Sequence, residues 1–181
     1  SCASEIHRTH PHIGTFGGQL VPRFECEPRS PLERSFGEER TFDADRWSNL
    51  VDDPRCMPWG AGMGVRRAVI NAYLAAVDRD PRRLLLGRSG TRLMTGEDLD
   101  MNYVAVKAGF GTGLFKALKL EHFITSQHMS EEHNIAYKGE ANGYSVTSLQ
   151  FLHFGRLGPP AMAWPTRILD WVDRRRMSPF K

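Results

Sequence analysis

The sequence predicts an α/β fold, because segments with strand character and segments with helical periodicity alternate along the chain. His12–Val21 and Leu114–Ile124 are rich in residues compatible with β-structure, and between them lie two helical patterns, Arg67–Asp78 and Leu99–Ala108. The chain has 181 residues, 40% of them hydrophobic and 25% charged, which is ordinary for one globular domain with its own core.

Charge and cysteine content exclude several classes of protein. The net charge of +3 is mild and, apart from Arg174–Arg176, the arginines are dispersed, so no nucleic-acid partner is expected. The spacing of the three cysteines suggests neither a disulfide framework nor a zinc site, and a reducing compartment is the default. No apolar run approaches the length of a membrane span, and we find no signal-peptide pattern. These features predict a cytoplasmic protein.

The first elements are a helix end and a strand. Residues 1–10 resemble the last turns of a helix that ends at Pro11. The strand His12–Val21 contains Gly17-Gly18, which predicts a bend, and Pro22 predicts its end. Because Glu25–Asp53 has many charges, several prolines and no clear period, we expect a long loop with short helical turns there.

A glycine-rich segment, Met57–Arg67, follows that loop. Its glycines have the spacing GxGxG, and no apolar strand precedes them, so a dinucleotide-binding loop is not indicated. The pattern favours a strand that another backbone approaches closely. Trp59 is either a core residue or an aromatic platform for a sugar, and the sequence leaves both interpretations open.

The next segment leads to an acidic motif. Arg67–Asp78 is amphipathic, Leu84–Leu86 is expected to be a short buried run, and Gly87–Gly96 is a polar loop. The motif itself places three carboxylates at the start of a helical pattern: Thr95-Gly96-Glu97-Asp98-Leu99-Asp100.

Thr95 and Asp98 have the spacing of a capping box, and acidic residues suit the positive end of a helix dipole. From Leu99 to Ala108 the polar residues are few, so we expect a buried helix whose acidic end opens into a cleft. Capping and catalysis are both consistent with these acids.

The C-terminal third contains one strand and several helical patterns. In Leu114–Ile124 the alternation places His122 on the core side, either as a buried histidine or as a ligand. A helix beginning at Gly143 would turn these side chains inward: Val146, Leu149, Leu152 and His153. A last helix follows Pro159-Pro160, and the arginines at its end either cap it or contact an anionic membrane.

The acidic motif resembles a known family. Gly96-Glu97-Asp98-x-Asp100 at the head of an apolar helix, followed by Ala105-x-x-Ala108-Gly109, is similar to the acceptor-side motif of family 2 glycosyltransferases. Trp59–Arg67 is similar to the segment that lines the acceptor site of that family. The resemblance covers most of His7–Gly155 and implies a GT-A (Rossmann-like) fold, a mixed sheet flanked by helices.

The resemblance also implies roles for individual residues. Asp98 would be the general base of an inverting hexosyltransferase-like reaction, and Glu97 would help to hold the acceptor. In the similar segment Trp59–Arg67, the residues implied to bind the acceptor are Trp59, Gly60, Gly62 and Arg66. The loop arginines Arg88 and Arg92 could contact an anionic donor or acceptor. His122 would reach a divalent metal, Mn²⁺ or Mg²⁺, that neutralises the leaving diphosphate.

The nucleotide-binding half of this family, with its metal-binding aspartates, is not recognisable here. We therefore expect residues 1–156 to be the acceptor-side half and residues 157–181 a helical extension. This fragment would be inactive alone and would expose an apolar face, including the strand Ile13–Val21, through which it would associate.

The complete enzyme would use a nucleotide-sugar donor and a glycan or lipid-linked acceptor, as in cell-surface polysaccharide biosynthesis. It would contact the inner face of the membrane peripherally.

Two alternative functions belong to other classes of protein. One is a non-catalytic truncated binding module, and the other is a metal-dependent hydrolase that uses Glu97, Asp98 and Asp100.

Overall fold

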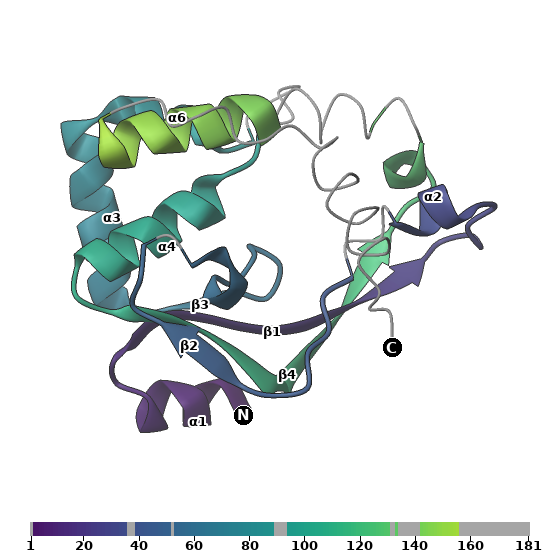
Figure 1. Ribbon diagram of the computed structural model, residues 1–181, viewed down its shortest axis with the longest axis horizontal. Coiled ribbons are helices and arrows are strands. Elements are labelled where there is room, and N and C mark those ends of the chain that lie inside the picture. Colours follow the sequence, from purple (N-terminus) through teal and green to yellow (C-terminus); the bar gives the residue numbers. More distant parts are fainter. Residues whose placement is uncertain are drawn as a thin grey trace, which may run out of the picture.

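A computed structural model describes residues 2–35, 39–51, 53–88, 94–130, 133 and 142–155. The predicted α/β class is confirmed: the described residues form a four-stranded mixed sheet with the strand order β2-β4-β1-β3. Helices α3, α4 and α6 lie on one side of this sheet and α1 lies on the other (Figure 1). This arrangement is compatible with a Rossmann-like fold.

The centre of the sheet is a parallel pair, β1 (Ile13–Phe24) and β4 (Gly111–Ile124). Both strands were predicted, and β4 begins three residues before the predicted start. The short strand β2 (Arg46–Ser48) pairs antiparallel with β4, and β3 (Gly64–Val65) pairs antiparallel with β1. The strand β2 lies inside the segment that we expected to be a loop.

The predicted bend in β1 is present, whereas the predicted end at Pro22 is wrong. The register with β4 shifts between Gly17 and Gln19, and a Cβ atom on Gly18 would lie 2.2 Å from the carbonyl oxygen of Leu118. The strand continues through Pro22 to Phe24. Among the described residues β3 pairs only with the start of β1 and Arg40 bridges to Leu20. Pro22 therefore lies beyond the paired part of this edge, where proline is tolerated.

The helical predictions are largely confirmed. The helix end predicted at the N-terminus is α1 (Cys2–Thr9), and the later patterns form α3 (Arg67–Arg79), α4 (Glu97–Lys107) and α6 (Asn142–Phe154). Shorter helical segments are α2 (Pro31–Ser35), η1 (Pro54–Cys56), η2 (Pro81–Leu86) and η3 (Gln127–Met129). The predicted extension 157–181 lies outside the described residues.

Two expectations about burial are wrong. The strand that we expected to expose an apolar face is buried, with Ile13, Phe16 and Leu20 no more than 5% exposed. Ile6 of α1 and Phe115 of β4 share a core cluster with the first two of these residues. The run at Leu84–Leu86 is buried only at Leu86, because the tight turns of η2 direct its neighbours outward. No helix within the described ranges is long and apolar enough to cross a bilayer.

Candidate functional site

The acidic motif forms the first turn of α4. Gly96 occupies the N-cap position with φ at 125°, a conformation that favours glycine, and the helix begins at Glu97. The predicted Thr95–Asp98 capping box is therefore wrong, because the cap is one residue later. Asp98 nevertheless serves the helix end, since its Oδ1 accepts the N–H of Leu99 at 2.8 Å.

The second oxygen of Asp98 connects the acidic motif to the glycine-rich segment. Oδ2 accepts the backbone N–H of Gly60 at 2.8 Å, across 38 residues of sequence. A Cβ atom on Gly60 would lie 3.6 Å from that same oxygen, so this segment packs directly against the carboxylate. Asp98 is half-buried. The two segments that carry the family resemblance thus meet at one carboxylate.

A second residue of α4, Asn102, holds the same segment. Its Nδ2 donates to the carbonyl oxygen of Pro58 at 2.9 Å, and its Oδ1 accepts the hydroxyl of Thr15 at 2.5 Å. Asn102 is fully buried. Because Asp98 and Asn102 lie one turn apart on α4, they grip residues 58–60 at two points. Sequence reasoning missed this role and counted Asn102 only among the few polar residues of the helix.

Trp59 lies between these two attachment points. It is 40% exposed, which favours the platform interpretation over the core interpretation. The guanidinium of Arg40 lies 4.7 Å from the centroid of the Trp59 ring and donates to the carbonyl oxygen of Met57 at 2.7 Å. Burial lowers the pKa of Arg40 to about 10. A cation and an aromatic surface therefore adjoin Asp98.

Arg66 was predicted to bind acceptor, and the structure uses it otherwise. Its guanidinium donates to the carbonyl oxygens of His7, Ile13 and His10 at 2.5, 2.5 and 2.8 Å. These contacts join the end of α1 to the start of β1, so we assign Arg66 a structural role.

The remaining predicted acceptor residues lie in different surroundings. Gly62 has φ at 72° and lines a cavity of about 360 Å³ with Phe16 and Leu118. Glu97 and Arg88 are exposed, and Arg92 lies outside the described residues. The structure thus brings together Asp98, Trp59 and Gly60 from the predicted set.

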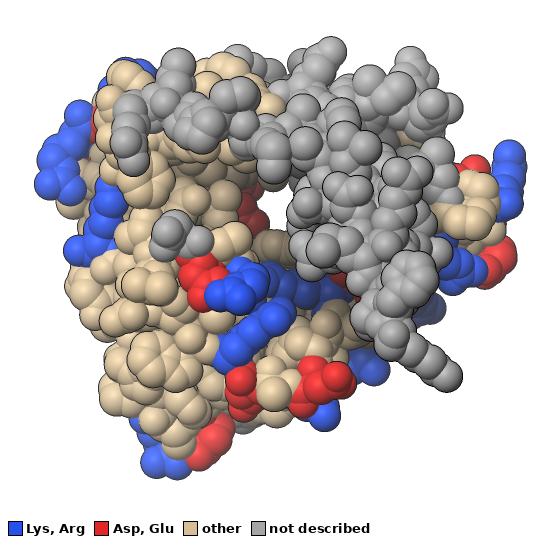
Figure 2. All heavy atoms as spheres, in the orientation of Figure 1, with Lys and Arg blue, Asp and Glu red and all other residues tan. Residues whose placement is uncertain are grey.

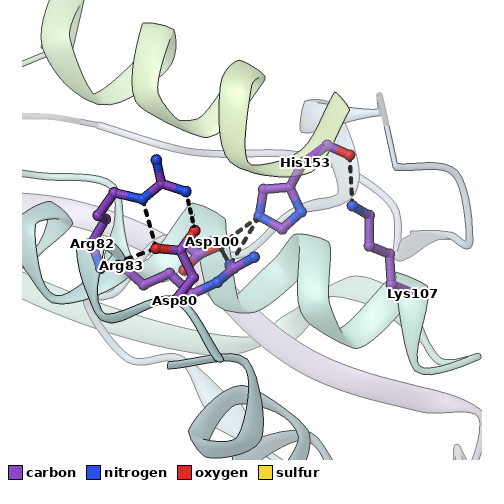
Figure 3. Close-up of polar contacts among 6 residues, drawn as sticks. All are labelled: Asp80, Arg82, Arg83, Asp100, Lys107 and His153. Atoms are coloured by element: carbon purple, nitrogen blue, oxygen red, sulfur yellow. Dashed lines mark hydrogen bonds and ion pairs between the residues drawn. The ribbon is translucent and has the colours of Figure 1, made fainter. Parts of the chain in front are cut away.

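Asp100 belongs to a separate, buried cluster (Figure 3). Its Oδ1 forms an ion pair with Arg83 of η2 and a hydrogen bond with Nε2 of His153 at 2.5 Å. Asp100 is 0% exposed, and Lys107 extends the cluster by donating to the carbonyl oxygen of His153 at 2.7 Å. Burial lowers the pKa of His153, against the opposing effect of the Asp100 carboxylate. This cluster fastens α6 and η2 to α4.

The metal prediction finds no support in this arrangement. His122 is half-buried on β4, and its Nδ1 is buried without a hydrogen-bond partner. In the part of the chain that the structure describes, no three side chains of His, Cys, Asp or Glu lie close enough together to hold a metal ion. That His122 ligates a metal stays a prediction, because the other ligands were expected from the nucleotide-binding half that is not recognisable here. The acidic cluster of the hydrolase alternative is also not formed, since Asp100 is buried against Arg83.

Comparisons with models of protein families, with curated proteins and with solved structures found no match to this chain.

Proposed function

We propose that this chain is the acceptor-side part of a GT-A glycosyltransferase that transfers a sugar from a nucleotide-sugar to a glycan or lipid-linked hydroxyl, with inversion. The observation that supports it most is the hydrogen bond between Gly60 N–H and Asp98 Oδ2 at 2.8 Å. This contact brings Trp59 beside a carboxylate, as a sugar acceptor would require. The family assignment still rests on the resemblance of the motifs.

Asp98 has the features of a general base. One backbone N–H binds each of its oxygens, which fixes the carboxylate, and each oxygen keeps a further lone pair that can accept a proton. A sugar ring packed on Trp59 would bring a hydroxyl toward this carboxylate. In the reaction, Asp98 would take the proton of the acceptor hydroxyl as its oxygen attacks the anomeric carbon and the nucleoside diphosphate leaves.

The test is Asp98→Asn in the protein that carries this chain. Asparagine can still accept a hydrogen bond from Gly60, but it cannot take a proton at neutral pH. We expect kcat for release of nucleoside diphosphate, across a panel of nucleotide-sugars and glycan acceptors, to fall by about 10²–10⁴-fold with donor binding unchanged. The matched control is Asp78→Asn on the exposed side of α3, which removes the same charge.

Near wild-type turnover by Asp98→Asn would show that Asp98 is not the base. If the unmodified protein turns over none of the panel and yet binds glycan, the non-catalytic binding module is the better description.

A further inference from the structure

Arg40, whose guanidinium lies over Trp59, and Arg46 have no carboxylate partner among the residues that the structure describes. Arg40 precedes β2 and Arg46 begins it, and both are half-buried. Arg55 and Arg82 form ion pairs with Asp53 and Asp80, whereas neither Arg40 nor Arg46 forms an ion pair within the described residues. Half-buried cations without counter-ions are costly, so their presence here calls for an explanation.

Arg40 reaches η1 and the Trp59 segment directly, and the strand β2, which begins with Arg46, packs against η1. Arg40 donates to the carbonyl oxygens of Arg55 and Met57, the residues on either side of Cys56. The charge of Arg46 acts on the Cys56 thiol, where it opposes the rise in pKa caused by burial. The same charge contributes to the lowered pKa of Arg40. The two cations are therefore close enough to repel each other.

Arg46 also has a donor without a partner. Its guanidinium lies 5.1 Å from the centroid of the Phe42 ring, and its Nε is buried with no hydrogen-bond acceptor among the described residues. A buried guanidinium N–H that lacks an acceptor is unfavourable, because it has lost its hydrogen bonds to water without replacing them. An oxyanion would satisfy this N–H and relieve the repulsion between the two cations.

We propose that Arg40 and Arg46 bind an oxyanion group, a carboxylate or a phosphate, carried by the acceptor whose sugar ring packs beside Trp59. Naming the ligand an acceptor rests on the proposed function, whereas binding of the anion does not. Figure 2 shows Lys and Arg side chains near the middle of one face, with Asp and Glu side chains beside them.

The experiment is a titration of the full chain at constant ionic strength, followed by ¹⁵N NMR of arginine Nε–H and tryptophan indole groups. The ligands are a disaccharide that ends in glucuronate, the matching disaccharide that ends in glucose, and inorganic phosphate. We expect the Arg46 Nε–H and the Trp59 indole to shift in a saturable way with the glucuronate disaccharide. The glucose disaccharide should bind at least tenfold more weakly, because it lacks the carboxylate that would accept hydrogen bonds from the two arginines.

Two variants give the matched comparison. Arg46→Gln should weaken binding of the anion about tenfold or more, since a hydrogen bond to a charged group is lost. Arg23→Gln removes the same charge from an exposed position on β1 and should leave the affinity unchanged. If Arg46→Gln fails to fold, the shift of the Arg46 resonance in the unmodified chain decides the question.

The outcomes separate the proposals. Saturable binding of phosphate but not of glucuronate supports the site and assigns it a phosphorylated acceptor. No saturable shift, equal affinity for the neutral disaccharide, or an equal loss in Arg23→Gln would each overturn it. Because the titration needs no sugar transfer, failure of Asp98 as the base leaves the anion site standing, and failure of the anion site leaves Asp98 as the base.

Discussion

Asp98 and Asp100 are two residues apart on α4 and have opposite surroundings. Asp98 is half-buried, accepts two backbone N–H groups and has no ion pair within the described residues. Asp100 is fully buried and neutralised by Arg83, with His153 as a further partner. The first carboxylate keeps lone pairs that a ligand could reach, as the proposed base requires, whereas the second holds α4 against η2 and α6.

Helix geometry explains the difference. Residues two apart on an α-helix point roughly 200° from each other, whereas residues four apart differ by only about 40°. Asp98 and Asn102 therefore share the side that grips residues 58–60, and Asp100 faces η2 and α6. One helix thus has a side that shapes the candidate site and a side that anchors the surrounding helices.

The largest expected effect comes from breaking the buried pair. Asp100→Asn leaves the Arg83 guanidinium buried without its counter-ion, which should lower the free energy of unfolding by about 3–5 kcal/mol. Asp98→Asn loses at most one hydrogen bond and should cost about 1 kcal/mol. Urea unfolding of both variants measures the difference, with Asp78→Asn as the surface control. Equal losses would contradict the division of roles between the two aspartates.

A smaller loss of stability is expected when Asn102, which holds residues 58–60 by a hydrogen bond, is replaced. Asn102→Leu leaves the Pro58 carbonyl and the Thr15 hydroxyl without their partner, which should cost about 2 kcal/mol of stability. The specific consequence is local, because residues 58–60 then lose one of two attachment points. Amide hydrogen exchange at Gly60 should become faster than the loss of global stability accounts for.

Thr15→Val is the matched control for that variant. It removes one hydrogen bond from Asn102 and keeps the bond from Asn102 to Pro58. Amide hydrogen exchange at Gly60 should then become faster only by the amount that the loss of global stability accounts for. If both variants expose Gly60 equally, Asn102 acts through general packing and not by positioning the Trp59 segment.

The sequence predicted the elements better than it predicted the contacts between them. The two long strands and the helices α3, α4 and α6 follow from hydrophobic periodicity, which is a local property. The strand β2 escaped prediction because three residues are too few to show a period. Its place is set by pairing with β4, far along the chain.

The site was predicted in part for the same reason. Asp98 and Trp59 stood out as residue types in motifs, but Asn102 acquires its role from Thr15, 87 residues away. Arg66 looked like a ligand-binding arginine, and only the fold shows that backbone carbonyls occupy its guanidinium. The helix α4 was expected to be buried, but the sequence could not show which tertiary partners its polar residues Asp100 and Asn102 would meet in the core.

The smallest expected effect is a pH dependence that belongs to the Asp100 side of α4 alone. Burial lowers the pKa of His153 from its usual value of 6.5, so below that pH the unfolded chain takes up a proton more readily than the folded one. Stability should therefore fall as pH falls below about 6.5, by at most about 1.4 kcal/mol per pH unit. Urea unfolding at pH 7.5, 6.5 and 5.5 measures this slope.

His153→Gln should flatten the pH dependence of stability because glutamine does not titrate, whereas His12→Gln, at an exposed position, should not. An unchanged slope in His153→Gln would mean that another group governs the acid sensitivity, and that the buried cluster is fixed by the Arg83–Asp100 pair without a contribution from a neutral histidine.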